Sequence, residues 1–237
     1  MYVFLSSVGL LIASFLGVIV YRYPRKLDFV WGRSKCDSCK AIIPWYQNIP
    51  IISYLVLGGK CANCKVKIPL RYFLLEILLP FLFILIYSLS PTGINPVIVG
   101  ITAFFMLAIF FIDYEHQIIP DVFVFIPLAV TIFYFLFSDS TFLFSHLFSG
   151  LLAASLLMLI HLITLGRGMG LGDVKFALLA GIYFDFYQML IWLFISFLTG
   201  AVIGVILLVT KKAKLGMHIP FGPFLVFAFF IELFMQL

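Results

Sequence analysis

Two aspartates lie directly beside long apolar runs. Asp113 begins the polar stretch DYEHQIIPD after an apolar run, and Asp173 ends the glycine-rich segment GMGLGD. A carboxylate at the edge of hydrocarbon is costly, so each is a candidate functional residue. Two neighbouring carboxylates cannot both ionise easily and therefore share a proton. Such a pair supports peptide hydrolysis, with one aspartate activating water and the other acting as the acid. Proton transport uses the same chemistry.

Each aspartate alone also has an ordinary structural explanation. Asp113 is typical of a solvated helix end, and Asp173 of a residue that caps the helix it opens. A third acid, Asp121, follows Pro120, and we interpret it as a helix N-cap or a support for the loop.

Glycines alternate through the segment before Asp173. Glycine permits positive φ and close backbone approach, so we expect Gly170 and Gly172 to form a turn that positions Asp173 and lays main-chain amides beside a substrate. No GK[ST] follows this turn and no strand precedes it, which argues against a phosphate-binding loop.

The four cysteines form two C-x-x-C pairs in a repeated context, KCDSCKAIIP and KCANCKVKIP. The pairs are Cys36 with Cys39 and Cys61 with Cys64, separated by 21 residues. This spacing favours a structural zinc site, in which each turn presents two thiolates to one tetrahedral ion. A redox pair and unligated thiols are the alternatives. Four thiolates leave no position for a catalytic water, so we expect the ion to stabilise the loop.

The rest of the chain has the composition of a membrane protein, with 64% hydrophobic and 11% charged residues. We predict an all-α polytopic fold of about eight transmembrane helices with a small cytoplasmic tetracysteine loop. The expected domains are a first transmembrane helix over 1–21, a cytoplasmic zinc loop over 22–71 and a membrane-embedded domain over 72–237. The expected later spans are 72–89, 96–112, 121–138, 142–165, 187–209 and 219–236, with a short helix after Asp173.

The basic residues predict the orientation. Ten of the 15 Lys and Arg lie between Arg22 and Arg71, and the other five are Arg167, Lys175, Lys211, Lys212 and Lys214. With eight spans, all of them fall on one side, which the positive-inside rule makes cytoplasmic. Both aspartates then lie at the cytoplasmic face. The net charge of +5 thus reports topology, and we predict no nucleic-acid partner.

In their order along the chain, these motifs resemble the type IV prepilin peptidases, GxGD-type aspartic proteases of the bacterial inner membrane. The tetracysteine loop is followed by ID-x-x-x-x-x-x-PD, then by GxGD, and then by PFGP at 220–223. The resemblance implies that Asp113 and Asp173 are the catalytic pair and that the cysteines form a metal cluster. It also implies a prepilin or pseudopilin substrate with a short basic leader, cut at the cytoplasmic face.

Many members of that family also methylate the new N-terminus with S-adenosylmethionine. Their first helix often carries Gly-Ser-Phe-x-Asn, where this chain has ASFLG ending at Gly17. They also often have a glycine four residues after a glutamate, where this chain has Glu76 and Pro80. These departures weaken the prediction of methylation.

Competing hypotheses are a proton-coupled transporter with a zinc-bearing regulatory loop, and a scaffold with a zinc docking module. The GxxxG pair Gly200 and Gly204 predicts helix packing.

Overall fold

The computed structural model describes residues 1–28, 31, 33–89, 94–138, 140–212, 214 and 218–235, apart from the side chains of 140–142. The chain divides into two compact units, Met1–Ser88 and Leu89–Leu237. Helices dominate both units, and the only β-pairing among the described residues is two isolated bridges. The predicted all-α class is confirmed.

The first unit contains two long helices and the cysteine loop between them. Its elements are α1 (Tyr2–Arg22), the 3-10 turn η1 (Trp45–Gln47), α2 (Ile52–Val56) and α3 (Leu70–Leu89). A Cβ at Gly9 of α1 would lie 2.8 Å from the Cα of Pro80, and one at Gly17 would lie 2.8 Å from the ring of Tyr72. These two glycines therefore let α1 lie directly against α3.

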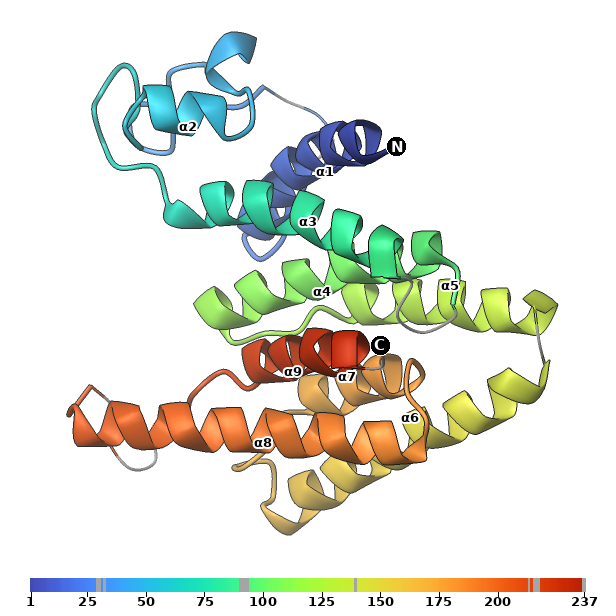
Figure 1. The fold of residues 1–237 in the computed structure, drawn as a ribbon. Coiled ribbons are helices and arrows are strands. Elements are labelled where there is room, and N and C mark those ends of the chain that lie inside the picture. Colours follow the sequence, from blue (N-terminus) through green and yellow to red (C-terminus); the bar gives the residue numbers. More distant parts are fainter. Residues whose placement is uncertain are drawn as a thin grey trace. The chain divides into compact units, whose positions relative to one another are not determined.

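The described part of the second unit contains six helices (Figure 1): α4 (Pro96–His116), α5 (Asp121–Ser138), α6 (Ser140–Ile163), α7 (Leu171–Gly181), α8 (Phe186–Val209) and α9 (Gly222–Met235). Within it, α4 packs against α5 and α9, α7 against α5, α6 and α9, and α8 against α6 and α9. The bounds of these helices differ from the predicted spans by only a few residues.

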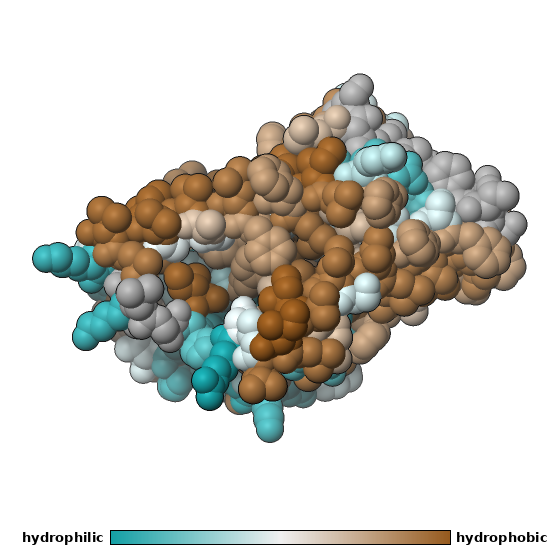
Figure 2. All heavy atoms as spheres, turned by 90° about the horizontal axis from the view of Figure 1, so that it is seen from below, coloured by the Kyte–Doolittle hydropathy of each residue, from teal (hydrophilic) through white to brown (hydrophobic). Residues whose placement is uncertain are grey.

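Six helices of the described chain are long and apolar enough to cross a membrane: α1, α3, α4, α5, α8 and the part of α6 from Leu143 to Ile163. The protein is therefore a multi-pass membrane protein, with α7 and α9 as shorter helices. Large apolar side chains such as Phe194, Val205 and Val209 of α8 are exposed, as expected for a helix that faces lipid. Figure 2 shows hydrophobic side chains over much of one face, with hydrophilic side chains in smaller groups among them.

Two features hold α7 among its neighbours. A Cβ at Gly181 would lie 2.8 Å from the Cα of Gly150, so these glycines allow the backbones of α6 and α7 to touch. Just after α7, the fully buried hydroxyl of Tyr183 lies 2.6 Å from Oγ1 of Thr102 in α4 and 2.7 Å from Oγ1 of Thr131 in α5. The three hydroxyls satisfy one another's hydrogen bonds and tie three helices together.

The GxxxG prediction is half correct. A Cβ at Gly200 would lie 3.2 Å from the ring of Phe221, so this glycine does lie at a packed surface of α8. One at Gly204 would meet no atom of the described residues within 4 Å. The second glycine of the motif therefore makes no close contact with the helices that the structure describes.

Candidate functional site

Asp113 lies in the last turn of α4 and is buried, with 5% of its surface exposed. The helix ends three residues later at His116, and the next residue, Gln117, has a left-handed φ of 55° and donates its N–H to the carbonyl of Asp113. The side chain points to the start of α9, where the Gly222 N–H donates to Oδ2 at 2.9 Å. A residue 109 positions away thus fixes one oxygen of this carboxylate.

Asp173 lies in the first turn of α7 and is also buried, at 8% exposed. Its Oδ2 accepts the N–H of Gly170 at 3.1 Å, so the side chain reaches back over the start of its own helix. This contact is the half of a capping box that a glycine N-cap can make. The capping interpretation of Asp173 is therefore correct, but capping uses only one of its two oxygens.

The fold brings these two aspartates of the second unit together. The charge of Asp113 acts on Asp173, so their carboxylates lie within electrostatic reach. Asp121 instead points to Lys175, with Oδ1 and Nζ 2.7 Å apart, and 57% of its side chain is exposed. Asp121 begins α5 and Lys175 belongs to α7, so this exposed ion pair bridges two helices that flank the site.

The glycine-rich turn differs from the expectation in one respect. None of Gly168, Gly170 and Gly172 has a positive φ, and the left-handed residues of this connection are Leu165 and Gly166. Of the two properties that favour glycine in this turn, positive φ is therefore not used at Gly170 or Gly172. Close approach is the reason for glycine at 172, where a Cβ would lie 3.0 Å from the Cβ of Ile119 in the α4–α5 connection.

Two side chains contact the backbone of the glycine-rich turn, one from the last turn of α6 and one from the residue just after this helix. Nδ1 of His161 lies 2.7 Å from the carbonyl oxygen of Met169, and Oγ1 of Thr164 accepts the N–H of Gly168 at 3.1 Å. A Cβ at Gly168 would lie 2.9 Å from Cγ2 of Thr164, so glycine is required here too. No local pattern indicates these contacts, because His161 and Thr164 look like ordinary residues of an apolar run.

Gly222 was also missed as a site residue. The PFGP segment is visible in the sequence, and Pro223 is typical of a helix start. Its role depends on the contact between α9 and α4, which no local pattern reveals. A second contact joins the same two segments, because Nε2 of Gln117 donates to the carbonyl of His218 at 3.3 Å.

In the first unit, all four predicted cysteines come together. Their Sγ atoms lie within 4.8 Å of one another, and those of Cys36 and Cys64 are 3.7 Å apart. Four thiolates placed about 2.3 Å from a tetrahedral ion would lie roughly 3.8 Å apart. The cluster could therefore hold a metal ion.

The two halves of the cluster repeat in structure as they do in sequence. The backbone N–H of Cys36 donates to the carbonyl of Ala41, and that of Cys61 donates to the carbonyl of Val66, five residues later in both halves. An isolated bridge closes each turn, from Lys35 to Ile42 in the first half and from Lys60 to Lys67 in the second. Each turn thus directs its two thiols to one point.

Backbone amides near the thiols favour the thiolate form. Those of Cys64 and Asn63 lower the pKa of Cys61 to about 6, and that of Ala41 lowers the pKa of Cys39. At Cys64 the amide of Val66 lowers the pKa, but burial and the neighbouring thiols outweigh it and raise this pKa to about 11. A bound cation would lower the pKa of this thiol, since thiolates are its ligands.

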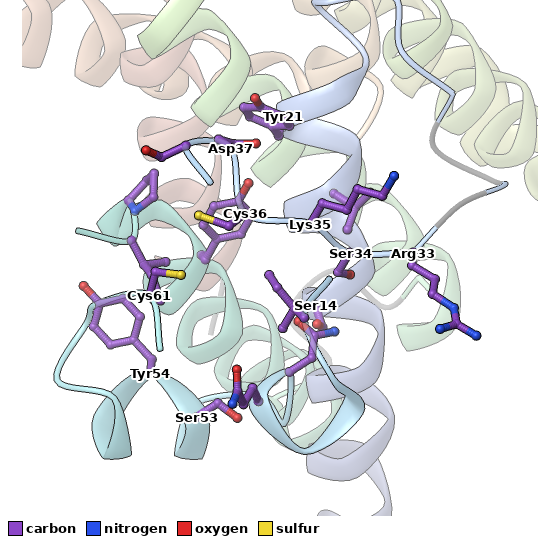
Figure 3. A pocket seen from close by; sticks show the side chains of 18 of the residues that line it. Ser14, Tyr21, Arg33, Ser34, Lys35, Cys36, Asp37, Ser53, Tyr54 and Cys61 are labelled. Carbon is purple, nitrogen blue, oxygen red and sulfur yellow. The ribbon is translucent and has the colours of Figure 1, made fainter. Parts of the chain in front are cut away.

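A cavity of about 700 Å³ lies beside the cysteines within the first unit (Figure 3). Its lining includes the rings of Tyr21, Tyr54 and Tyr72 and the carboxylate of Glu76. Oε2 of Glu76 accepts the N–H of Ile51 at 2.7 Å, and Ile51 has a φ of 63°, which a β-branched residue rarely adopts. The cavity is large enough for a small organic ligand.

Known proteins match this chain along nearly its whole length. Residues 7–89 match the family model of the bacterial peptidase A24 N-terminal domain, and residues 100–205 match that of the type IV leader peptidase family. The chain is 34% identical to the prepilin leader peptidase/N-methyltransferase of Pseudomonas aeruginosa, covering 95% of this chain and 87% of that protein.

Proteins of the same name from Neisseria gonorrhoeae and Vibrio cholerae are 31% and 29% identical, over 92% and 97% of this chain and 85% and 94% of theirs. No solved structure matches the chain at a significant level. The identity and coverage of the relatives, together with the two family models, show that this chain belongs to the type IV leader peptidase family.

Proposed function

We propose that this protein cleaves the leader peptide from prepilins or pseudopilins, with Asp113 and Asp173 as its catalytic pair. The observation that carries the proposal is the arrangement of two buried carboxylates at the ends of two helices that both pack against α5 and α9, each carboxylate with one oxygen fixed by a backbone amide. The family membership and the names of the relatives give the substrate class.

The chemistry follows from two carboxyl groups that share one proton. The ionised aspartate removes a proton from water as the water oxygen attacks the scissile carbonyl carbon, and the protonated aspartate gives its proton to the carbonyl oxygen. Collapse of the tetrahedral intermediate breaks the C–N bond, and a proton passes to the leaving amine. The amides of Gly222 and Gly170 hold one oxygen of each aspartate, which directs the other toward water or substrate.

We infer that this site faces the cytoplasm from the inner membrane. With eight crossings, the ends of α4 and α7 that carry the aspartates fall on the same side of the membrane as Arg167 and Lys175. The positive-inside rule makes that side cytoplasmic. The stretch between Phe111 and Asp121 carries acids and no Lys or Arg, so it would attract a basic leader.

For the cysteine cluster we propose zinc. Four thiolates in two C-x-x-C turns are a preferred ligand set for zinc, and a closed tetrahedral site gives the ion a structural role. The boundaries 1–21, 22–71 and 72–237 remain our proposal for how anchor, zinc loop and peptidase divide the chain.

We further propose that the protein methylates the new N-terminus, since its relatives are named as N-methyltransferases. S-adenosylmethionine carries a sulfonium cation and an aromatic base. The cavity of the first unit offers both a carboxylate and tyrosine rings for these groups. The methyl donor would supply the methyl group to the free amine that cleavage creates. A transporter has no support from the family or from the relatives.

The direct test is to incubate the purified protein, in detergent or lipid, with a prepilin and S-adenosylmethionine and to measure the product by mass spectrometry. We expect loss of the leader, followed by a gain equal to one methyl group. An uncut prepilin would contradict the peptidase proposal. A cut but unmodified product would contradict only the methylation.

A further inference from the structure

The PFGP segment has a place in the site that the proposed mechanism does not yet explain. Asp113 Oδ2 accepts the N–H of Gly222, the first residue of α9. We propose that Gly222 is a positioning residue: its amide and its missing side chain together hold the Asp113 carboxylate in the orientation that cleavage requires. This inference rests on the proposed role of Asp113.

The hydrogen bonds at the start of α9 show why Asp113 is needed there. The first N–H groups of a helix have no partner within the helix. Here Phe224 and Leu225 donate to the carbonyl of Phe221, and Pro223 has no N–H. The N–H of Gly222 donates to Asp113 instead, so a carboxylate from α4 caps α9. A negative group also suits the positive end of a helix dipole.

The space at Gly222 admits no side chain. A Cβ built there would lie 2.7 Å from Oδ2, 3.1 Å from Cγ and 3.2 Å from Cβ of Asp113. These three nearest atoms all belong to Asp113. Even an alanine must therefore push the carboxylate away or break the hydrogen bond that aims it.

Contacts on either side keep α9 in place. Gln117, at the end of α4, donates to the carbonyl of His218 just before α9. Further along, Nε1 of Trp192 in α8 donates to the carbonyl of Leu225 at 3.0 Å, and the rings of Phe197 and Phe221 lie 5.2 Å apart. Because α9 is anchored to both neighbours, a Cβ at 222 would displace Asp113 more readily than it would displace the helix.

The test compares Gly222→Ala with Gly204→Ala. Gly204 lies in α8, and its added Cβ would meet no atom within 4 Å among the residues that the structure describes, so the same substitution there should leave cleavage unchanged. We expect Gly222→Ala to lower kcat about 100-fold, the effect of misplacing a catalytic group by about 1 Å, while KM changes little. Cleavage of a prepilin by Gly222→Ala at the rate of Gly204→Ala would overturn the inference.

A thermal-stability cycle tests the same contact without activity. Gly222→Ala should lower the melting temperature of the wild-type chain, and it should lower it much less in an Asp113→Ala background, because Cγ and Oδ2 are then gone. An equal loss in both backgrounds would place the clash elsewhere and overturn the inference, even if Gly222→Ala folded poorly. The cycle stays informative if no prepilin is cleaved by the wild type, a result that would contradict the proposed function and not this contact.

Discussion

At the scale of single residues, the two aspartates are held in the same way. Each has Oδ2 on the N–H of a glycine at the start of a helix, Gly222 for Asp113 and Gly170 for Asp173. Both aspartates could be predicted from the sequence, because an acid beside an apolar run is conspicuous whatever the fold. The partner of Asp173 is only three residues away, so helix-capping patterns can predict this hydrogen bond from the sequence. The partner of Asp113 depends on how α9 meets α4.

Asp121 tests whether every acid near the site matters. We expect Asp121→Asn to retain most cleavage, because Asp121 binds Lys175 and leaves the catalytic pair untouched. The exposed ion pair should contribute no more than about 1 kcal/mol to stability. Cleavage rate and thermal melting of this variant check both statements. Loss of all cleavage in a folded Asp121→Asn protein would move the catalytic role to this residue.

Gly172 tests the close packing beside Asp173. Gly172→Val should cut turnover strongly and cost about 1–3 kcal/mol of stability, because its Cβ would lie 3.0 Å from the Cβ of Ile119 and the branched side chain would crowd the α4–α5 connection. The matched control is Gly204→Val, whose Cβ meets no atom of the described part of the chain within 4 Å. Equal turnover in the two variants would contradict a role for this contact.

At the scale of elements, the sequence predicts the long helices closely because apolar runs and their polar ends mark them. The predicted span 121–138 coincides with α5, and 96–112 stops one turn short of the end of α4. That last turn of α4 carries the polar residues DYEH, so hydropathy alone ends the helix too early. The glycine turn could not be resolved further from the sequence, because glycine serves both positive φ and close packing, and only the neighbouring Ile119 distinguishes them.

The repeated cysteine turns give a prediction for the loop. The purified protein should carry about one zinc per chain, the stoichiometry of one four-thiolate site. Replacing Cys36 and Cys39 together with serine should remove the zinc and open residues 22–71 to limited proteolysis, because the ion joins the two turns. Ser38→Ala, an exposed change within the first turn, is the control.

Elemental analysis and proteolysis patterns measure these outcomes. Zinc affinity should also fall as the pH falls, since protons compete with the ion for the thiolates. A reduced wild-type preparation with no zinc, or a double variant that keeps its zinc, would contradict the assignment.

At the scale of the whole molecule, the charge pattern defines a topology that the helices can satisfy. The described chain has six helices of membrane-spanning length, and α7 and α9 are shorter. An odd number of crossings between Arg22 and Lys211 would put their basic residues on opposite sides. The proposed orientation therefore depends on the short helix α7 counting as a crossing.

Reporter fusions test this topology directly. Alkaline phosphatase needs an oxidising compartment to form its disulfides, so it should be active when fused after Ser138 and inactive when fused after Lys212. A green fluorescent protein should report the converse. Active phosphatase after Lys212 would contradict both the count of crossings and the cytoplasmic position of the site.

The most direct test of the account is prepilin cleavage by Asp113→Asn and Asp173→Asn, each compared with Asp121→Asn. The asparagine carbonyl oxygen can still accept the glycine N–H, so both variants should fold and melt close to the wild type while losing the acid/base function. We predict that mass spectrometry finds no cleaved product from either variant and abundant product from Asp121→Asn. Cleavage at the wild-type rate by either Asp113→Asn or Asp173→Asn would contradict the catalytic pair.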